Sequence, residues 1–266
     1  MALPGFHPIV ADWFRGRFGA PTEVQARGWE AIRSGRDALL SAPTGSGKTL
    51  AAFLVCLDDL VRRAAEGSLE PGVHVVYVSP LKALSNDIRK NLEEPLAEIA
   101  ALAAARGLDL PPIRVATRTG DTRPAERQAL ARKPPHVWVT TPESLYILLG
   151  SASGRAGLRT ARTLLLDEVH AVADDKRGSH LALTVERLDA LAGRRLQRIG
   201  LSATVNPLET IASLLVGAPG MRPDGRPDCA IVDAGRLRAL DLEVALPKAE
   251  LGPMATHAVW GDVLDR

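Results

Sequence analysis

The sequence feature that most constrains the fold is a glycine-bearing segment at residues 42–49, Ala-Pro-Thr-Gly-Ser-Gly-Lys-Thr. It follows a short apolar run at 38–41 and precedes a stretch of helical periodicity at 50–63. Small residues let the backbone fold tightly around phosphate oxygens, and the N–H groups at the start of a helix attract negative charge. A strand, this loop and a helix, in that order, form the context that a phosphate-binding loop requires.

The segment predicts a nucleotide-binding loop in which individual residues have separate tasks. Lys48 is expected to reach the β- and γ-phosphates, and the Thr49 hydroxyl to bind Mg²⁺. Ala42 stands where the usual pattern has its first glycine. The alternative is a Gly/Ser turn that contains a lysine by chance. The flanking strand and helix make such a chance match less frequent. The loop residues expected to bind the nucleotide are Ala42, Pro43, Thr44, Gly45, Ser46, Gly47, Lys48 and Thr49.

A second motif ends an apolar run at 163–166 with two adjacent carboxylates, Asp167 and Glu168. In an open parallel sheet, ligands bind beyond the carboxyl ends of the strands. Asp167 is suited to hold Mg²⁺, and Glu168 to orient and deprotonate an attacking water molecule. The alternative is a charged strand cap, which is common when such a pair occurs alone. Together with the phosphate-binding loop, the pair predicts phosphoryl-transfer chemistry, with Lys48, Asp167 and Glu168 as the catalytic residues.

The chain alternates between short apolar runs and longer stretches with helical periodicity. This alternation predicts βαβ units, and runs that are apolar on both faces are typical of central parallel strands covered on both sides. Buried helix segments are the alternative, but the short lengths and the β-branched residues disfavour them. We expect an α/β fold with a central, mainly parallel β-sheet and helices on both faces. The expected strands are 38–41, 73–79, 113–117, 136–140, 163–166 and 199–201, with edge strands at 230–232 and 240–246.

Composition excludes some classes of protein. The 266 residues carry 33 Lys+Arg against 31 Asp+Glu, so binding to nucleic acid through bulk positive charge is excluded. The two cysteines, Cys56 and Cys229, are far apart and show no metal-ligand spacing, which favours a reducing compartment. The strongly apolar stretch at 50–57 is too short to cross a bilayer, and the N-terminus lacks the pattern of a signal peptide. We therefore expect a cytoplasmic protein with no membrane partner.

Further motifs occur in an order that makes the chain resemble a superfamily 2 helicase. They are Gln25, APTGSGKT (42–49), SPLKALSND (79–87), TGD (119–121), TTPES (140–144), DEVH (167–170) and SAT (202–204). The resemblance covers residues 7–246. Within the superfamily, the stretches around these motifs resemble the large helicase-related (Lhr) group, which is adjacent to the Ski2-like enzymes. DEVH in place of DEAD separates the chain from the DEAD-box group.

The resemblance implies a RecA-like P-loop NTPase fold and an ATP-dependent helicase or translocase that uses ATP and Mg²⁺. Its expected partners are single-stranded DNA or an RNA:DNA hybrid, and a second RecA-like domain that this chain lacks. The expected polarity of movement along the strand is 3′ to 5′. DNA repair is the pathway that the likeness suggests. A non-catalytic, nucleotide-gated nucleic-acid-binding module is the alternative. The domains implied are N-terminal helices with the adenine-recognition segment (1–36), the first RecA-like domain (37–247) and the start of a linker (248–266).

The resemblance also implies roles for single residues in nucleotide recognition and coupling. Gln25 is expected to recognise adenine, because a carboxamide can pair with both an exocyclic amine and a ring nitrogen; the alternative is an exposed glutamine on a helix surface. His170 is expected to bridge the two motor halves, or else to be structural. Ser202 and Thr204 are expected to link the nucleotide site to the nucleic-acid track. For these two, a turn or a helix N-cap before Asn206 and Pro207 is also open.

The nucleic-acid track is expected to cross the loops that follow the other strands. Helix starts there offer backbone N–H groups to phosphates, with Thr141 as N-cap and Pro142 at the first helical position. For Arg127 and Arg132, a solvated helix face is the preferred interpretation. The residues expected to contact nucleic acid are Pro80, Lys82, Ala83, Thr119, Gly120, Thr141 and Pro142.

Overall fold

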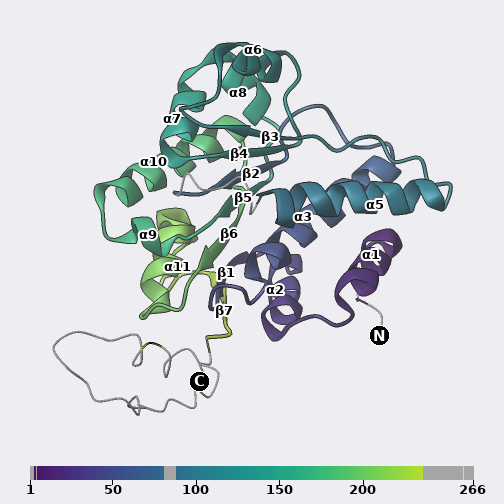
Figure 1. The fold of residues 1–266 in the computed structure, drawn as a ribbon. Helices are drawn as coiled ribbons and strands as arrows, with labels where there is room; N and C mark the ends of the chain where they lie inside the picture. The colour runs from purple at the N-terminus through teal and green to yellow at the C-terminus, as the bar shows by residue number, and fades with distance from the viewer. Residues whose placement is uncertain (1–2, 4, 81–87, 236–259, 261–266) are drawn as a thin grey trace. The chain divides into compact units, whose positions relative to one another are not determined.

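A computed structural model describes residue 3, residues 5–80 and 88–235, and Trp260 (Figure 1). The chain divides into two units, Met1–Gly235 and Arg236–Arg266, and the fold below is that of the first. In the second unit only Trp260 is described, and it is exposed. The predicted contacts of Lys82 and Ala83 and the predicted strand at 240–246 lie outside the described residues, as does the predicted domain boundary at 247/248.

The described strands form one sheet in which every neighbouring pair is parallel. Their order is β3-β4-β2-β5-β6-β1-β7, so the chain crosses between strands through helices (Figure 1). The predicted parallel sheet is confirmed, and β7 is an edge strand as expected. The bounds are β1 Asp37–Ser41, β2 Val75–Val78, β3 Val115–Arg118, β4 Val137–Thr140, β5 Thr163–Leu166, β6 Gln197–Ser202 and β7 Cys229–Asp233.

Helices cover both faces of the sheet because consecutive strand residues point to opposite sides. In β1, Leu40 packs into one buried cluster with helices α1, α2, α3 and α5, while Leu39 packs into the other with α7, α8, α10 and α11. The bounds are α1 Pro8–Phe18, α2 Glu23–Arg33, α3 Lys48–Ala65, α5 Glu94–Ala105, α6 Pro124–Arg132, α7 Pro142–Gly150, α8 Ala152–Leu158, α9 His170–Ala173, α10 Lys176–Ala192 and α11 Leu208–Val216. A π-helical turn, η1 Arg89–Glu93, leads into α5, and a 3₁₀ turn, η2 Ala218–Gly220, follows α11.

Helix α2 begins where the sequence places its cap. The Thr22 hydroxyl accepts a hydrogen bond from the Gln25 N–H at 3.4 Å, and the Gln25 carboxamide oxygen accepts one from the Thr22 N–H at 2.9 Å. This reciprocal capping box satisfies two N–H groups that a helix start leaves free. It also fixes Gln25 in the first turn of the helix.

Among the helices that the structure describes, none is both long enough and apolar enough to span a bilayer.

Candidate nucleotide-binding and coupling site

The strand order brings the phosphate-binding loop and the acidic pair to the same edge of the sheet. β6 pairs with β1 on one side and with β5 on the other, all parallel. Adjacent strands lie about 4.8 Å apart, so the ends of β1 and β5 are separated by roughly 10 Å. The loop leaves β1 through Ala42, whose N–H donates to the Ser202 carbonyl of β6 at 3.2 Å. Asp167 directly follows β5, so both motifs face one region of space.

The loop itself has the backbone and the unused polar groups of an anion site. Gly45 and Gly47 have φ values of +80° and +89°, which side chains with a Cβ rarely adopt. Gly47 is the N-cap of α3 and provides no side-chain cap, so N–H groups at that helix start stay available. The Ser46 hydroxyl is buried and has no hydrogen-bond partner among the described residues. Lys48 is only 4% exposed.

Gln25 lies against this loop. It is 5% exposed, so the alternative of a glutamine on an exposed helix surface is wrong. A Cβ placed on Gly47 would come within 2.7 Å of the Gln25 Nε2 atom. The Thr22 hydroxyl donates to the Ser46 carbonyl at 3.1 Å, which attaches the start of α2 to the loop a second time. The sequence motif places Gln25 in the site, but it gives no sign of the Thr22 contact.

Alanine substitutions at the two loop glycines are expected to lower the free energy of unfolding by different amounts. Gly45→Ala is expected to cost about 1 kcal/mol in the free energy of unfolding, because its Cβ meets nothing within 4 Å and only backbone strain remains. Gly47→Ala is expected to cost about 2 kcal/mol, since the added methyl group also displaces Gln25 and breaks the capping box. Urea denaturation of the nucleotide-free chain measures both, and equal losses would contradict the packing of Gln25 on Gly47.

Asp167 is held by two hydrogen bonds at the bottom of the site. The Glu168 N–H donates to Asp167 Oδ1 at 2.9 Å, and the Tyr77 hydroxyl donates to Oδ2. Burial raises the pKa of Asp167, whereas the hydrogen bond from Tyr77 lowers it. The negative charge of Glu168 raises this pKa further, and the positive charge of Lys48 lowers it. The strand order places this carboxyl and the phosphate-binding loop at the same edge of the sheet. Sequence reasoning missed Tyr77, whose only signal is an aromatic hydroxyl within the aliphatic strand β2.

Glu168 has a φ of +47° and is the only residue other than glycine with positive φ among those described. Such a backbone costs on the order of 1–3 kcal/mol and persists only where surrounding contacts hold it. Here the Val169 N–H donates to the Leu201 carbonyl at 3.0 Å, and the Asp167 N–H donates to the Val78 carbonyl at 2.8 Å. These bonds fix the residues on both sides of Glu168.

His170 connects the acidic pair to the end of β6. Its Nδ1 atom lies 3.3 Å from Glu168 Oε2 and 3.2 Å from the Ser202 hydroxyl, and it accepts a hydrogen bond from the Ala203 N–H at 3.3 Å. Ser202 is fully buried, whereas Thr204 is exposed. Neither caps α11, whose N-cap is Pro207 without a side-chain bond, so the helix-cap alternative is wrong. A bridge from His170 to another domain stays a prediction.

The residues predicted to contact nucleic acid occupy the other half of the same edge. Pro80 follows β2, Thr119 and Gly120 follow β3, and Thr141 follows β4, and these three strands are neighbours. Thr141 caps α7 by accepting a hydrogen bond from the Ser144 N–H at 3.3 Å, and Pro142 is the first helical residue, as predicted. The structure therefore separates the nucleotide residues, beyond β5, β6 and β1, from the predicted track beyond β3, β4 and β2.

The sequence interpretation of Arg127 is wrong. The sequence favours a solvated helix face for it, but its guanidinium donates to the carbonyls of Thr122 and Gly120, each at 2.7 Å. It thereby braces the loop between β3 and α6, since an arginine can donate several hydrogen bonds in a fixed geometry. Arg132, in the last turn of α6, is exposed as predicted.

Comparison with known proteins agrees with this geometry. The family model described as DEAD/DEAH box helicase matches residues 22–211. The chain is 50% identical over 241 residues to the ATP-dependent helicase Lhr-Core of Methanothermobacter thermautotrophicus, covering 91% of this chain and 27% of that protein. It is 44% identical over 257 residues to the Lhr helicase/uracil glycosylase of Escherichia coli, covering 95% and 16%.

A solved structure gives the same relationship in three dimensions. The structure of Mycobacterium smegmatis helicase Lhr bound to ssDNA and AMP-PNP superposes with a TM-score of 0.81 at 44% identity, over 99% of this chain and 32% of that one. The chain thus spans about a quarter of the length of the Lhr-Core relative and about a third of the solved chain. The matched family model and the RecA-like sheet together show that this chain belongs to the DEAD/DEAH box helicase family.

Proposed function

We propose that the chain is the ATP-binding motor half of an ATP-dependent helicase that moves along single-stranded nucleic acid. The observation that carries this proposal is the meeting of Lys48, Asp167 and Glu168 at one edge of the sheet, beside a loop with unused anion-binding groups. The reaction is ATP + H₂O → ADP + phosphate. The presence of Lys48, Asp167 and Glu168 favours a catalytic motor domain over a non-catalytic, nucleotide-gated module.

In this proposal, the chain's own residues bind the triphosphate and direct the water molecule. The loop N–H groups and the Lys48 ammonium hold the phosphates, and Gln25 recognises the base at the start of α2. Glu168 accepts the proton of the attacking water molecule. Its position 3.3 Å from His170, which contacts Ser202, gives a route by which the state of the γ-phosphate reaches the end of β6.

The donor set fits Mg²⁺. This ion is commonly held by one or two protein oxygens together with substrate phosphates and water, and Thr49 and Asp167 supply a hydroxyl and a carboxylate. Asp167 already accepts bonds from Tyr77 and Glu168, which orient the carboxylate before any ion binds. When bound, Mg²⁺ neutralises the charge that develops on the phosphates.

One relative supports the proposed substrate. The Mycobacterium smegmatis protein is described as bound to ssDNA and AMP-PNP, which supports single-stranded DNA here; an RNA:DNA hybrid, 3′-to-5′ polarity and a role in DNA repair remain parts of the proposal. The proposed domains are 1–36, 37–247 and 248–266, followed by a second RecA-like domain that supplies arginine fingers. The buried, unpaired thiols of Cys56 and Cys229 support a cytoplasmic location.

Phosphate release from ATP, measured with and without an oligo-dT strand, tests this function. We expect the strand to stimulate release by the natural full-length protein, because nucleic acid and the second domain complete the site. Nucleotide-dependent changes in strand affinity without any ATP turnover would instead favour the non-catalytic module. Stimulation should fall as salt rises, since contacts to strand phosphates displace counterions.

A further inference from the structure

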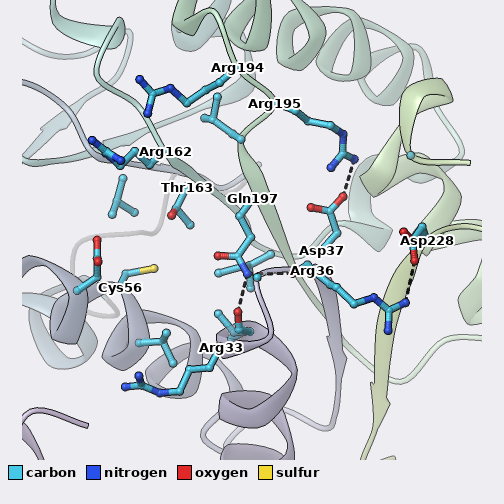
Figure 2. Close-up of a pocket in the computed structure, with 18 of the residues that line it drawn as sticks. Arg33, Arg36, Asp37, Cys56, Arg162, Thr163, Arg194, Arg195, Gln197 and Asp228 are labelled. Carbon is cyan, nitrogen blue, oxygen red and sulfur yellow. Dashed lines mark hydrogen bonds and ion pairs between the residues drawn. The ribbon is translucent and has the colours of Figure 1, made fainter. Parts of the chain in front are cut away.

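A large pocket lies at the edge of the sheet opposite the nucleotide site (Figure 2). Its volume is about 960 Å³, and its lining includes the first residues of four strands, Asp37, Val75, Thr163 and Gln197. The phosphate-binding loop and the acidic pair instead follow the last residues of β1 and β5. The pocket is therefore separated from the ATP site by the length of the strands, and the proposed function makes no use of it.

The pocket carries an excess of positive charge. Eight arginines and four aspartates line it, which leaves a formal excess of four positive charges when histidine is neutral. All four aspartates are already in ion pairs: Asp37 with Arg195, Asp58 with Arg33 and Arg62, Asp59 with Arg63, and Asp228 with Arg36 and Arg222. The internal carboxylates therefore do not neutralise the excess.

The excess is concentrated at Arg162 and Arg194. Neither side chain has an ion pair or a hydrogen bond among the described residues, both residues are exposed, and Figure 2 shows them at the same side of the pocket. Their segments lie near each other, because the Arg162 carbonyl accepts a hydrogen bond at 3.0 Å from the N–H of Gln197, three residues after Arg194. Burial lowers the pKa of Arg162, and the charges of Arg63 and Arg194 lower it further. The carboxylates of Asp59 and Glu70 act on Arg162 in the opposite direction but do not reverse the shift.

Polar atoms without partners lie in the same lining. His74 Nδ1 and Arg33 Nε are buried and have no hydrogen-bond partner among the described residues. The opposite ring nitrogen of His74 is 2.8 Å from the Glu70 carbonyl, so it carries the proton, and Nδ1 presents a lone pair. Arg162 is close by, since its N–H donates to the His74 carbonyl at 3.0 Å. A buried polar group without a partner calls for an explanation, and a bound ligand supplies one.

We propose that this arginine pocket binds a compact polyphosphate anion, with Arg162 and Arg194 as its main contacts and Arg63 beside them. Guanidinium groups match phosphate oxygens in a bidentate geometry. The volume is that of a small-ligand site, whereas a single strand is usually held in an extended groove lined by aromatic side chains. Pyrophosphate is the simplest ligand with this charge density.

The test is calorimetric titration of inorganic pyrophosphate into the Lys48→Ala chain, in which the phosphate-binding loop no longer competes. We expect saturable binding of one pyrophosphate per chain. The double variant Arg162→Ala/Arg194→Ala in the same background should weaken it by about 10-fold or more, since it removes two charge-assisted contacts to phosphate. The matched control, Arg132→Ala/Lys133→Ala, removes two exposed positive charges from another surface and should leave the affinity within about twofold.

Several outcomes would overturn the proposal. One is the absence of saturable binding by the Lys48→Ala chain, and another is an equal loss in both double variants, which would indicate general charge attraction. A third is oligo-dT or poly-glutamate binding through Arg162 and Arg194 while pyrophosphate does not bind. Thermal denaturation of the double variant checks folding, and its Tm should not fall, because the substitution removes repulsion between like charges. None of these measurements requires ATP hydrolysis. A failure of the proposed pyrophosphate binding is therefore distinct from a failure of the proposed motor function.

Discussion

Lys48→Ala is expected to lower the affinity of the chain for ATP by about 10- to 100-fold. Lys48 is buried at the start of α3, in the loop whose N–H groups are proposed to hold the phosphates, and its ammonium is proposed to contact the β- and γ-phosphates. Charge-assisted contacts to phosphate in a partly desolvated site are each worth about 1.5–3 kcal/mol. The upper end of that range corresponds to a factor of roughly 100 in the dissociation constant. Titration with a fluorescent ATP analogue measures it.

A matched control separates the site from general charge. Lys133→Ala removes an exposed lysine after α6 and should leave the ATP affinity within about twofold. The Lys48→Ala chain should retain the Tm of the parent, because the methylene groups of the side chain contribute little and the loop backbone is held by Thr22 and Gln25. ATP binding by Lys48→Ala that matches the parent would contradict the phosphate-binding role.

Features carried by neighbouring residues were predictable from the sequence. The strand runs, the phosphate-binding loop and the caps of α2 and α7 depend on a few consecutive side chains, and the structure has them at the predicted positions. Strand ends were accurate to one or two residues. The bounds of β2, β3 and β6 differ most from the prediction, each by two residues at its start and one at its end.

Contacts between distant segments were not predictable in this way. The order of the strands decides that Tyr77 meets Asp167, 90 residues later, and nothing local marks that hydroxyl. Arg127 folds back on its own loop because Gly120 and Thr122 leave carbonyls free, which a helical pattern does not reveal. The arginine pocket likewise gathers residues from the starts of strands that are far apart in the sequence.

Glu168→Gln is expected to lower kcat for ATP hydrolysis by about 10²–10⁴-fold, the usual contribution of a general base. The substitution keeps the size of the side chain and the unusual backbone of the site, and only the capacity to accept a proton is lost. Affinity for ATP should therefore stay close to that of the parent, since Lys48 and the loop remain. Single-turnover phosphate release by the natural full-length protein, with saturating single-stranded DNA, is the measurement, because the proposed second domain would supply arginine fingers, which contribute roughly 10³–10⁵ in rate.

The control for this variant is Glu209→Gln, which makes the same chemical change at an exposed position in the first turn of α11. Its kcat should match that of the parent. Because Glu168 lies 3.3 Å from His170, the carboxamide introduced by Glu168→Gln can still meet the histidine, so strand-dependent ATP binding should survive while turnover does not. A kcat equal to that of the parent would remove Glu168 from the role of base. A loss of ATP affinity as large as that of Lys48→Ala would instead show that the acidic side chain acts in binding the nucleotide.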